Sequence, residues 1–184
     1  IIAGNSAEHA LLMIAAKLAG VPVAAISPVA LTAPGDRGRL RRMLALLTPG
    51  LVYSAFAEPV LFDLPEMQGV EIVLPQRVAG LRAAGFAELE APGFALPAPP
   101  DPDAPAKIVF TSGSTSAPKG VVLTQRMMAA NQAQIAAVWP LLRARPPELL
   151  CWLPWSHVFG GTHNLNMVLV HGGTLWLDEG RPMP

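Results

Sequence analysis

The sequence predicts an α/β fold with mostly parallel sheets flanked by helices, and two observations carry that prediction. Short apolar runs alternate with segments of helical periodicity, which is typical of βα units around a parallel sheet. Hydrophobic residues make up 52% of the 184 residues and charged residues only 14%. That composition suits strands buried on both faces and excludes a disordered chain.

The first half of the chain shows the alternation most clearly. Asn5 or Ser6 is placed to cap a helix whose apolar residues share one face, and Gly20 is placed to end it. Asp36 precedes a second helical pattern, with Leu40, Met43, Leu44 and Leu47 at i, i+3, i+4, i+7 spacing. Strands are expected at residues 1–4, 21–26, 51–54 and 71–74.

A proline-rich connector, residues 91–105, separates the two halves. Prolines stand at positions 92, 97, 99, 100, 102 and 105, and so many prolines forbid a helix or a central strand. The connector marks either a boundary between subdomains or a long surface crossing. Beyond it we expect strands at 107–111, 121–124, 149–153 and 174–177, with helices over about 125–142 and 161–170.

Charge, hydropathy and cysteine usage exclude several classes of protein. Thirteen basic residues balance thirteen acidic ones, so no net positive field favours nucleic acid. The most apolar region, residues 10–33, is interrupted by Lys17, Gly20 and Pro22, so no membrane span is expected. The single Cys151 indicates a reducing compartment, and we expect a cytoplasmic protein. The first and last residues suggest an internal piece of a longer protein.

The most informative segment is the loop Thr111–Gly120, which reads TSGSTSAPKG and follows an apolar strand. Small residues let backbone N–H groups approach a phosphate, hydroxyls add donors, and Lys119 supplies a positive charge. The loop is not a Walker A motif, because Lys119 is followed by Gly120 instead of Ser or Thr. It also lacks the Gly-x-Ser-x-Gly of a nucleophile elbow. The alternative is a plain Ser/Gly turn between two strands.

This loop resembles the phosphate-binding signature of the adenylate-forming superfamily, which includes acyl-CoA synthetases and luciferases. The signature reads Thr-Ser-Gly-Ser/Thr-Thr-Gly-x-Pro-Lys-Gly, and the chain departs from it only at Ser116, where Gly is usual. The resemblance implies that residues 1–184 are part of the large N-terminal AMP-binding domain, with the small C-terminal domain absent from this chain. It also implies a two-step reaction in which a carboxylate attacks ATP and a thiol, usually that of CoA, takes the acyl group.

The resemblance assigns roles to the loop residues by position. The residues implied to hold ATP phosphates are Thr111, Ser112, Gly113, Ser114, Thr115, Ser116, Lys119 and Gly120. Lys119 is the candidate for a catalytic role there, and Mg²⁺ would accompany ATP and offset the charge of the leaving pyrophosphate. CoA is expected as the second substrate.

A second segment places an imidazole between aromatic rings just before a helix. Pro154 and His157 fall where acyl-CoA synthetases carry a Pro-x-x-His element, which implies that His157 lies on the acid side of the site. Trp155 and Phe159 are candidates to stack on an aromatic acid, with core packing as the alternative. Cys151, His157 and His163 are spaced six and six residues apart, which fits no zinc arrangement, so no metal site is predicted.

The wider sequence resembles the feruloyl-CoA synthase branch. The matching stretches are GNSAEH at 4–9, ISP at 26–28, LLTPG at 46–50, the run from Cys151 to Leu169 and DEGRP at 178–182. The branch implies an aryl acid substrate and a place in phenylpropanoid degradation. Two other functions stay open: loading of a carrier-protein thiol, and a non-catalytic nucleotide-binding module. The Tyr-Gly-x-Thr-Glu element that helps bind adenine in the superfamily does not occur in this chain.

Overall fold

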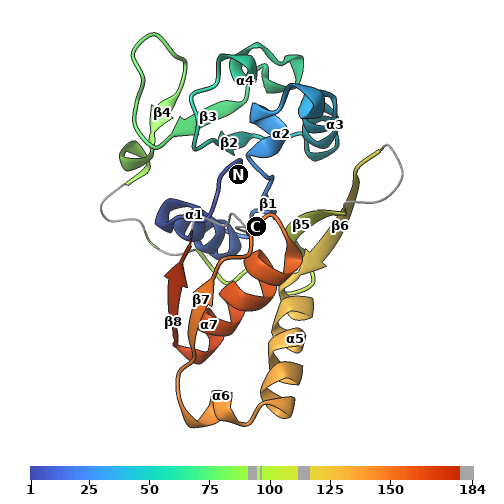
Figure 1. Ribbon diagram of the computed structural model, residues 1–184, viewed down its shortest axis with the longest axis vertical. Coiled ribbons are helices and arrows are strands. Elements are labelled where there is room, and N and C mark those ends of the chain that lie inside the picture. Colours follow the sequence, from blue (N-terminus) through green and yellow to red (C-terminus); the bar gives the residue numbers. More distant parts are fainter. Residues whose placement is uncertain (91–94, 96, 112–116, 179–184) are drawn as a thin grey trace.

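The computed structural model describes residues 1–90, 95, 97–111 and 117–178, and it consists of two lobes stacked along the long axis (Figure 1). The upper lobe contains α2 (Val29–Thr32), η1 (Pro34–Asp36), α3 (Arg37–Leu47), β2 (Leu51–Tyr53), α4 (Pro59–Asp63), η2 (Pro65–Met67), β3 (Glu71–Leu74), β4 (Ala84–Gly85) and η3 (Phe86–Leu89). The lower lobe contains α1 (Ala7–Leu18), β1 (Val23–Ala24), β5 (Pro105–Thr111), β6 (Lys119–Thr124), α5 (Gln125–Val138), α6 (Leu141–Ala144), β7 (Glu148–Cys151), η4 (Phe159–Asn164), α7 (Leu165–His171) and β8 (Thr174–Leu177).

The upper lobe is a parallel sheet covered by helices. Its strands lie in the order β2–β3–β4, and both neighbouring pairs are parallel. The apolar residues spaced along α3 (Leu40, Met43 and Leu44) are buried and pack with Val52 and Ile72 of the sheet. The amphipathic pattern of α3 therefore supplies one side of this core, as the sequence predicts.

The lower lobe contains two small sheets with helices between them. One has the order β1–β5–β6, in which β1 and β5 are parallel and β5 and β6 form an antiparallel pair. The other is the parallel pair β7–β8. Helix α7 lies between β7–β8 and α5 in Figure 1 and packs on both β8 and α5.

The N-terminal segment ties the two lobes together. Ile2 is bridged in parallel to Ile26 on one side and to Ser54 on the other. The backbone N–H of Ile2 donates to Tyr53 at 2.8 Å, and that of Ile26 donates to Ile1 at 2.8 Å. Residues 1–4 thus act as an extended link between the sheets, and Ile2 itself is buried in the upper core.

The α/β prediction is confirmed. Six predicted strands are found, with ends that differ from the predicted ones by no more than two residues: 51–54, 71–74, 107–111, 121–124, 149–153 and 174–177. The expected strand at 21–26 is regular only over β1. Ser6 is the cap of α1, since its Oγ accepts from the backbone N–H of His9 at 3.2 Å. Asp36 precedes α3 as expected, but its side chain makes no capping hydrogen bond within the described structure.

Three predicted boundaries are wrong. The helix expected over 125–142 ends at Val138, because Pro140 disfavours helical backbone in the residue before it and starts the separate helix α6. The helix expected over 161–170 begins as the π-helix η4 and becomes α-helical only at Leu165. The proline connector ends one residue early, because Pro105 is the first residue of β5, a position where a strand tolerates proline.

Candidate functional site

The β5–β6 hairpin brings the two ends of the Thr111–Gly120 loop together. Thr111, the last residue of β5, lies opposite Lys119, the first residue of β6, in antiparallel register. Both side chains are exposed, so both are accessible to a ligand held at the loop. Ser112, Gly113, Ser114, Thr115 and Ser116 lie outside the described residues. The hairpin thus fixes the two ends from which the loop extends.

Gly120 lies close to side chains of the opposite strand in the hairpin. A Cβ atom built on it would lie 3.2 Å from Ile108 Cγ2 and 3.6 Å from a ring carbon of Phe110. Gly120 pairs with Phe110, so the missing side chain lets the Phe110 ring lie against the backbone of β6. Contact between the two strands of the hairpin thus favours a glycine at this position.

The segment that carries His157 is a tight turn held by Asn5. The backbone N–H of His157 donates to Pro154 at 3.0 Å, which closes the turn. Asn5 bonds the same segment twice: its Nδ2 donates to Leu153 at 3.0 Å, and its Oδ1 accepts from the N–H of Trp155 at 3.0 Å. Asn5, two residues before the start of α1, therefore fixes the turn through contacts far apart in sequence.

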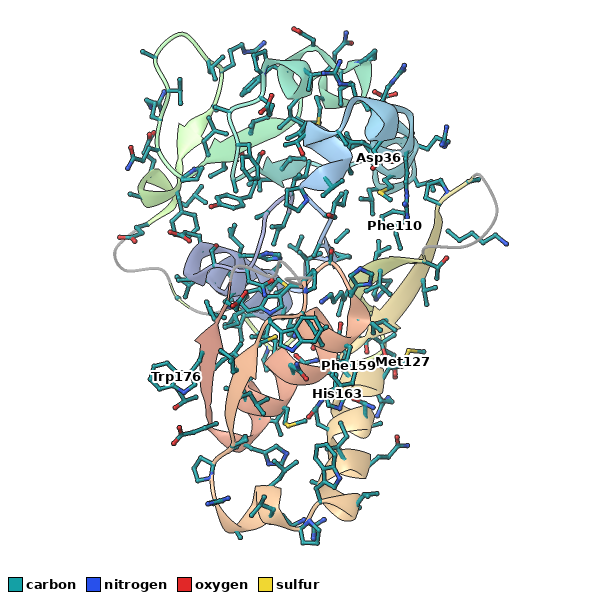
Figure 2. The ribbon with its side chains drawn as sticks, in the orientation of Figure 1. Asp36, Phe110, Met127, Phe159, His163 and Trp176 are labelled. Carbon is teal, nitrogen blue, oxygen red and sulfur yellow. The ribbon has the colours of Figure 1, made fainter. Side chains whose placement is uncertain are left out.

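A cavity of about 290 Å³ connects the hairpin with this turn. Ser156 and His157 line one side of it, and Phe110, next to the loop, lines another. Figure 2 shows Phe110 on the hairpin below Asp36 of the upper lobe, and both residues line the cavity. Arg39 adds a cation from α3. A second cavity, of about 510 Å³, shares Ser27, Val29 and Ser156 with the first.

Neither Trp155 nor Phe159 is among the described residues that line the cavity of His157, although Trp155 lines the second cavity. Trp155 is 1% exposed and packs with Met13 and Leu165, so the described structure favours its core role. Its ring meets that of His9 edge to face, with centroids 5.2 Å apart. Phe159 is 54% exposed and stacks on His163 at 4.6 Å, below Phe110 in Figure 2. It is absent from the lining of the His157 cavity, so the geometry does not support stacking on an acid there.

Sequence reasoning missed two residues that shape the site. Phe110 was expected only as part of a strand, yet it lines the cavity. Lys107 lies in the middle of β5, is fully buried, and donates from Nζ to the carbonyl of Gly161 in η4. The signal for Lys107 was a charged residue inside the apolar run 106–110, where buried strands rarely carry a charge.

The whole chain, residues 1–184, matches the family described as AMP-binding enzyme. The chain belongs to the AMP-binding enzyme family. Among solved structures of similar fold is the luciferase-like enzyme of the mealworm Zophobas morio, with a TM-score of 0.75 at 21% identity. That likeness covers 99% of this chain and 41% of the mealworm protein. A malonyl-CoA ligase with methylmalonyl-CoA and AMP bound has a TM-score of 0.68 at 27% identity, covering 99% of this chain and 35% of that one.

Curated relatives of this AMP-binding chain are CoA ligases that act on different acids. A sulfoacetate–CoA ligase of Cupriavidus necator is 43% identical over 77 residues, which are 42% of this chain and 15% of that protein. A 4-coumarate–CoA ligase of Narcissus pseudonarcissus is 46% identical over 66 residues, which are 34% of this chain and 11% of that protein. The match therefore spans less than a sixth of either relative.

Neither a metal cluster nor a membrane helix is found in the part of the chain that the structure describes. No group of three or more His, Cys, Asp or Glu side chains gathers there to hold a metal ion. The described helices also include none that is long and apolar enough to cross a membrane.

Proposed function

We propose that the full-length protein is an ATP-dependent carboxylate–CoA ligase that forms an acyl-adenylate and then a CoA thioester, releasing AMP and pyrophosphate. The observation that carries the proposal is the β5–β6 hairpin, which sets Lys119 opposite Thr111 beside the cavity lined by Phe110 and His157. A phosphate-binding loop next to a cavity is the arrangement that joining ATP to an acid requires. Membership of the AMP-binding family supports the same reaction class.

The loop residues are assigned to the leaving pyrophosphate. Lys119 and the loop hydroxyls would stabilise the charge that develops when the carboxylate displaces pyrophosphate from the α-phosphorus. The exposed side chains of Thr111 and Lys119 are compatible with that contact. Ser112, Ser114, Thr115 and Ser116 complete the proposed set with the backbone at Gly113 and Gly120. Mg²⁺ bound to ATP is part of the substrate in this proposal.

His157 is assigned to the acid side of the site, and the acid is proposed to be aryl, of the feruloyl or hydroxycinnamoyl type. His157 lines the cavity with Ile26, Met43 and Phe110, whose apolar side chains suit an aromatic ring. The 4-coumarate–CoA ligase among the relatives supports an aryl acid, whereas the sulfoacetate–CoA ligase shows that the family also uses small acids. Phenylpropanoid degradation in the cytoplasm is the setting that this substrate suggests.

The domain assignment is part of the same proposal. Residues 1–184 would form the first portion of the large N-terminal domain, with the connector 91–105 joining two subdomains. In support, η3 closes the upper lobe, and β5 begins the hairpin of the lower lobe on the other side of that connector. The small C-terminal domain would be encoded outside this chain.

The test uses the full-length protein with ATP, Mg²⁺ and one acid at a time. Acid-dependent exchange of pyrophosphate into ATP measures the first step, and CoA thioester formation measures the second. Ferulate and 4-coumarate should support both steps far better than sulfoacetate or a medium-chain fatty acid. Exchange without a CoA thioester would favour a carrier-protein thiol as acceptor. ATP binding with no exchange for any acid would leave a non-catalytic nucleotide-binding module.

A further inference from the structure

Lys107 is a buried cation without an acidic partner. It is 0% exposed in the middle of β5, and within the described chain it forms no ion pair with a carboxylate. The contacts of its Nζ are the carbonyl oxygen of Gly161, to which it donates, and Met13 Sδ at 3.8 Å. A buried charge of this kind is costly unless its hydrogen bonds serve a specific purpose.

The surroundings of Lys107 make its charge still less favourable. Burial, together with the charge of the neighbouring Lys17 of α1, lowers the pKa of Lys107 to about 7. His9, also of α1, is the other basic group that faces it, since the charge of Lys107 lowers the pKa of His9. An apolar side chain at position 107 would avoid this cost, so the specific gain from lysine is its bond to Gly161.

Gly161 is in direct contact with the turn that carries His157. Its backbone N–H donates to the carbonyl of His157 at 3.0 Å. A Cβ built on Gly161 would lie 2.1 Å from the carbonyl oxygen of Trp155, and one on Gly160 would lie 2.6 Å from that of Leu153. The π-helix η4 is therefore pressed against residues 153–157, and a shift of Gly161 must shift the turn. Helical segments of this type are often found at functional sites.

We propose that Lys107 is a positioning residue, which holds the turn carrying His157 in fixed register with the strand that leads into the phosphate loop. Lys107 is four residues before Thr111 on β5, and its Nζ donates to the carbonyl of Gly161, the residue whose own N–H donates to the carbonyl of His157. One side chain thus links the ATP side of the site to the acid side. This inference rests on the proposed function, because it assigns His157 to the acid.

The first test compares Lys107→Met with Lys17→Met in the full-length protein. Met keeps the length of the side chain and removes the donor. Lys17 is the matched control, because it is a partly buried lysine close to Lys107. Its Nζ donates to Asn166 of α7, whereas that of Lys107 donates to Gly161 beside the turn that carries His157. We expect Lys107→Met to raise KM for the acid about tenfold, the usual effect of losing a hydrogen bond to a charged group, with KM for ATP unchanged. Lys17→Met should change neither constant.

The inference would be overturned if Lys107→Met had the same KM for the acid as the parent. It would also be overturned if KM for the acid and KM for ATP rose in parallel. A double-mutant cycle makes the test specific to His157. In a His157→Ala background, Lys107→Met should leave KM for the acid unchanged, because the group that it positions is gone. The same increase in both backgrounds would mean that Lys107 acts independently of His157, and would also overturn the inference.

Lys107→Gln serves as the second variant if Lys107→Met does not fold. Gln keeps an N–H donor but shortens the side chain, so it should not reach the Gly161 carbonyl, and its acid KM should rise above the parental value with KM for ATP unchanged. A parental acid KM in Lys107→Gln would overturn the inference. Failure of the proposed function is distinguishable, since the parent itself would then show no acid-dependent exchange.

Discussion

At the scale of single residues, Lys119 is the group proposed to stabilise the charge of the leaving pyrophosphate. Its position opposite Thr111 keeps the ammonium at the end of the loop, where a leaving pyrophosphate would develop charge. Asn5, Lys107 and Gly161 act one step further away, by fixing the backbone that presents His157. The proposed site would thus combine an exposed cation for the phosphates with a buried network that positions His157 for the acid.

Lys119→Ala should slow adenylate formation while sparing thioester formation from supplied adenylate. Loss of one preorganised charge at a developing oxyanion typically costs roughly 10²–10³ in rate. Pyrophosphate exchange measures the first half-reaction, and CoA consumption with synthetic acyl-adenylate measures the second. Arg143→Ala, which removes an exposed cation in α6 at the opposite end of the lower lobe, is the control and should affect neither. Equal losses in both half-reactions would contradict the phosphate role of Lys119.

His9 makes stability depend on pH. Burial lowers the pKa of His9 from 6.5 to about 4, the charge of Lys107 contributes in the same direction, and the hydrogen bond to the Gly4 carbonyl opposes it. Between these two values the unfolded chain takes up a proton that the native protein does not. The unfolding free energy should therefore fall as the pH is lowered from 6.5 to 4, by about 3 kcal/mol over the interval.

Urea unfolding of the full-length protein across that pH interval measures the effect. His9→Gln lacks the titrating ring, so its unfolding free energy should decrease less steeply on acidification than that of the parent. Only the slope matters, because the substitution also removes the edge contact with Trp155. Identical slopes in the two proteins would show that His9 does not account for the pH dependence.

At the scale of elements, local periodicity predicted the helices and strands whose conformation depends on the pattern of their own side chains. The strand at 71–74 and the apolar face of α3 follow from side-chain patterns alone. Periodicity could not predict the π-helix, because it depends on Gly160 and Gly161 lying against the backbone of residues 153–155, a contact that side-chain patterns do not encode. The burial of Trp155 against Met13 and the bond of Lys107 to Gly161 join residues far apart in sequence, so local patterns could not assign them.

The glycines of η4 and α3 give opposite predictions for the same substitution. Gly161→Ala would place Cβ 2.1 Å from the Trp155 carbonyl oxygen, so η4 must move, and overpacking of this kind typically lowers the unfolding free energy by about 1–3 kcal/mol or more. Gly38 is the second residue of α3, and its Cβ would meet only Arg42 Nη1 at 3.7 Å. Gly38→Ala should raise the unfolding free energy by roughly 0.5–1 kcal/mol, because alanine loses less backbone entropy.

Thermal and urea unfolding of the two variants beside the parent check this pair. Gly161→Ala should also raise KM for the acid, since the turn carrying His157 is bonded to Gly161. A Gly161→Ala protein as stable as the parent would mean that η4 can shift away from the strand end without cost, which would weaken the link between η4 and the acid side.

At the scale of the whole molecule, the faces that this chain leaves exposed are as informative as its core. The sheet β7–β8 has two strands, and its residues Leu150 and Trp176 are 69% and 59% exposed. Trp152, which directly follows β7, is 49% exposed. Trp176 projects from the outer side of that sheet in Figure 2. A two-stranded sheet with large exposed apolar side chains is marginal in water. The curated relatives are also much longer than the segments that match them.

We therefore predict that the isolated chain 1–184 does not form an acyl-adenylate, whereas the full-length protein does. The loop supplies contacts to phosphates, but the Tyr-Gly-x-Thr-Glu element expected to help bind adenine does not occur among these 184 residues. The isolated chain should give no acid-dependent pyrophosphate exchange and should bind a hydrophobic dye strongly, because Trp152 and Trp176 would face water. The full-length protein should exchange pyrophosphate and bind little dye, since further chain would cover this face. Exchange by the isolated chain at a rate near that of the full-length protein would show that residues 1–184 already contain every group that the first half-reaction needs.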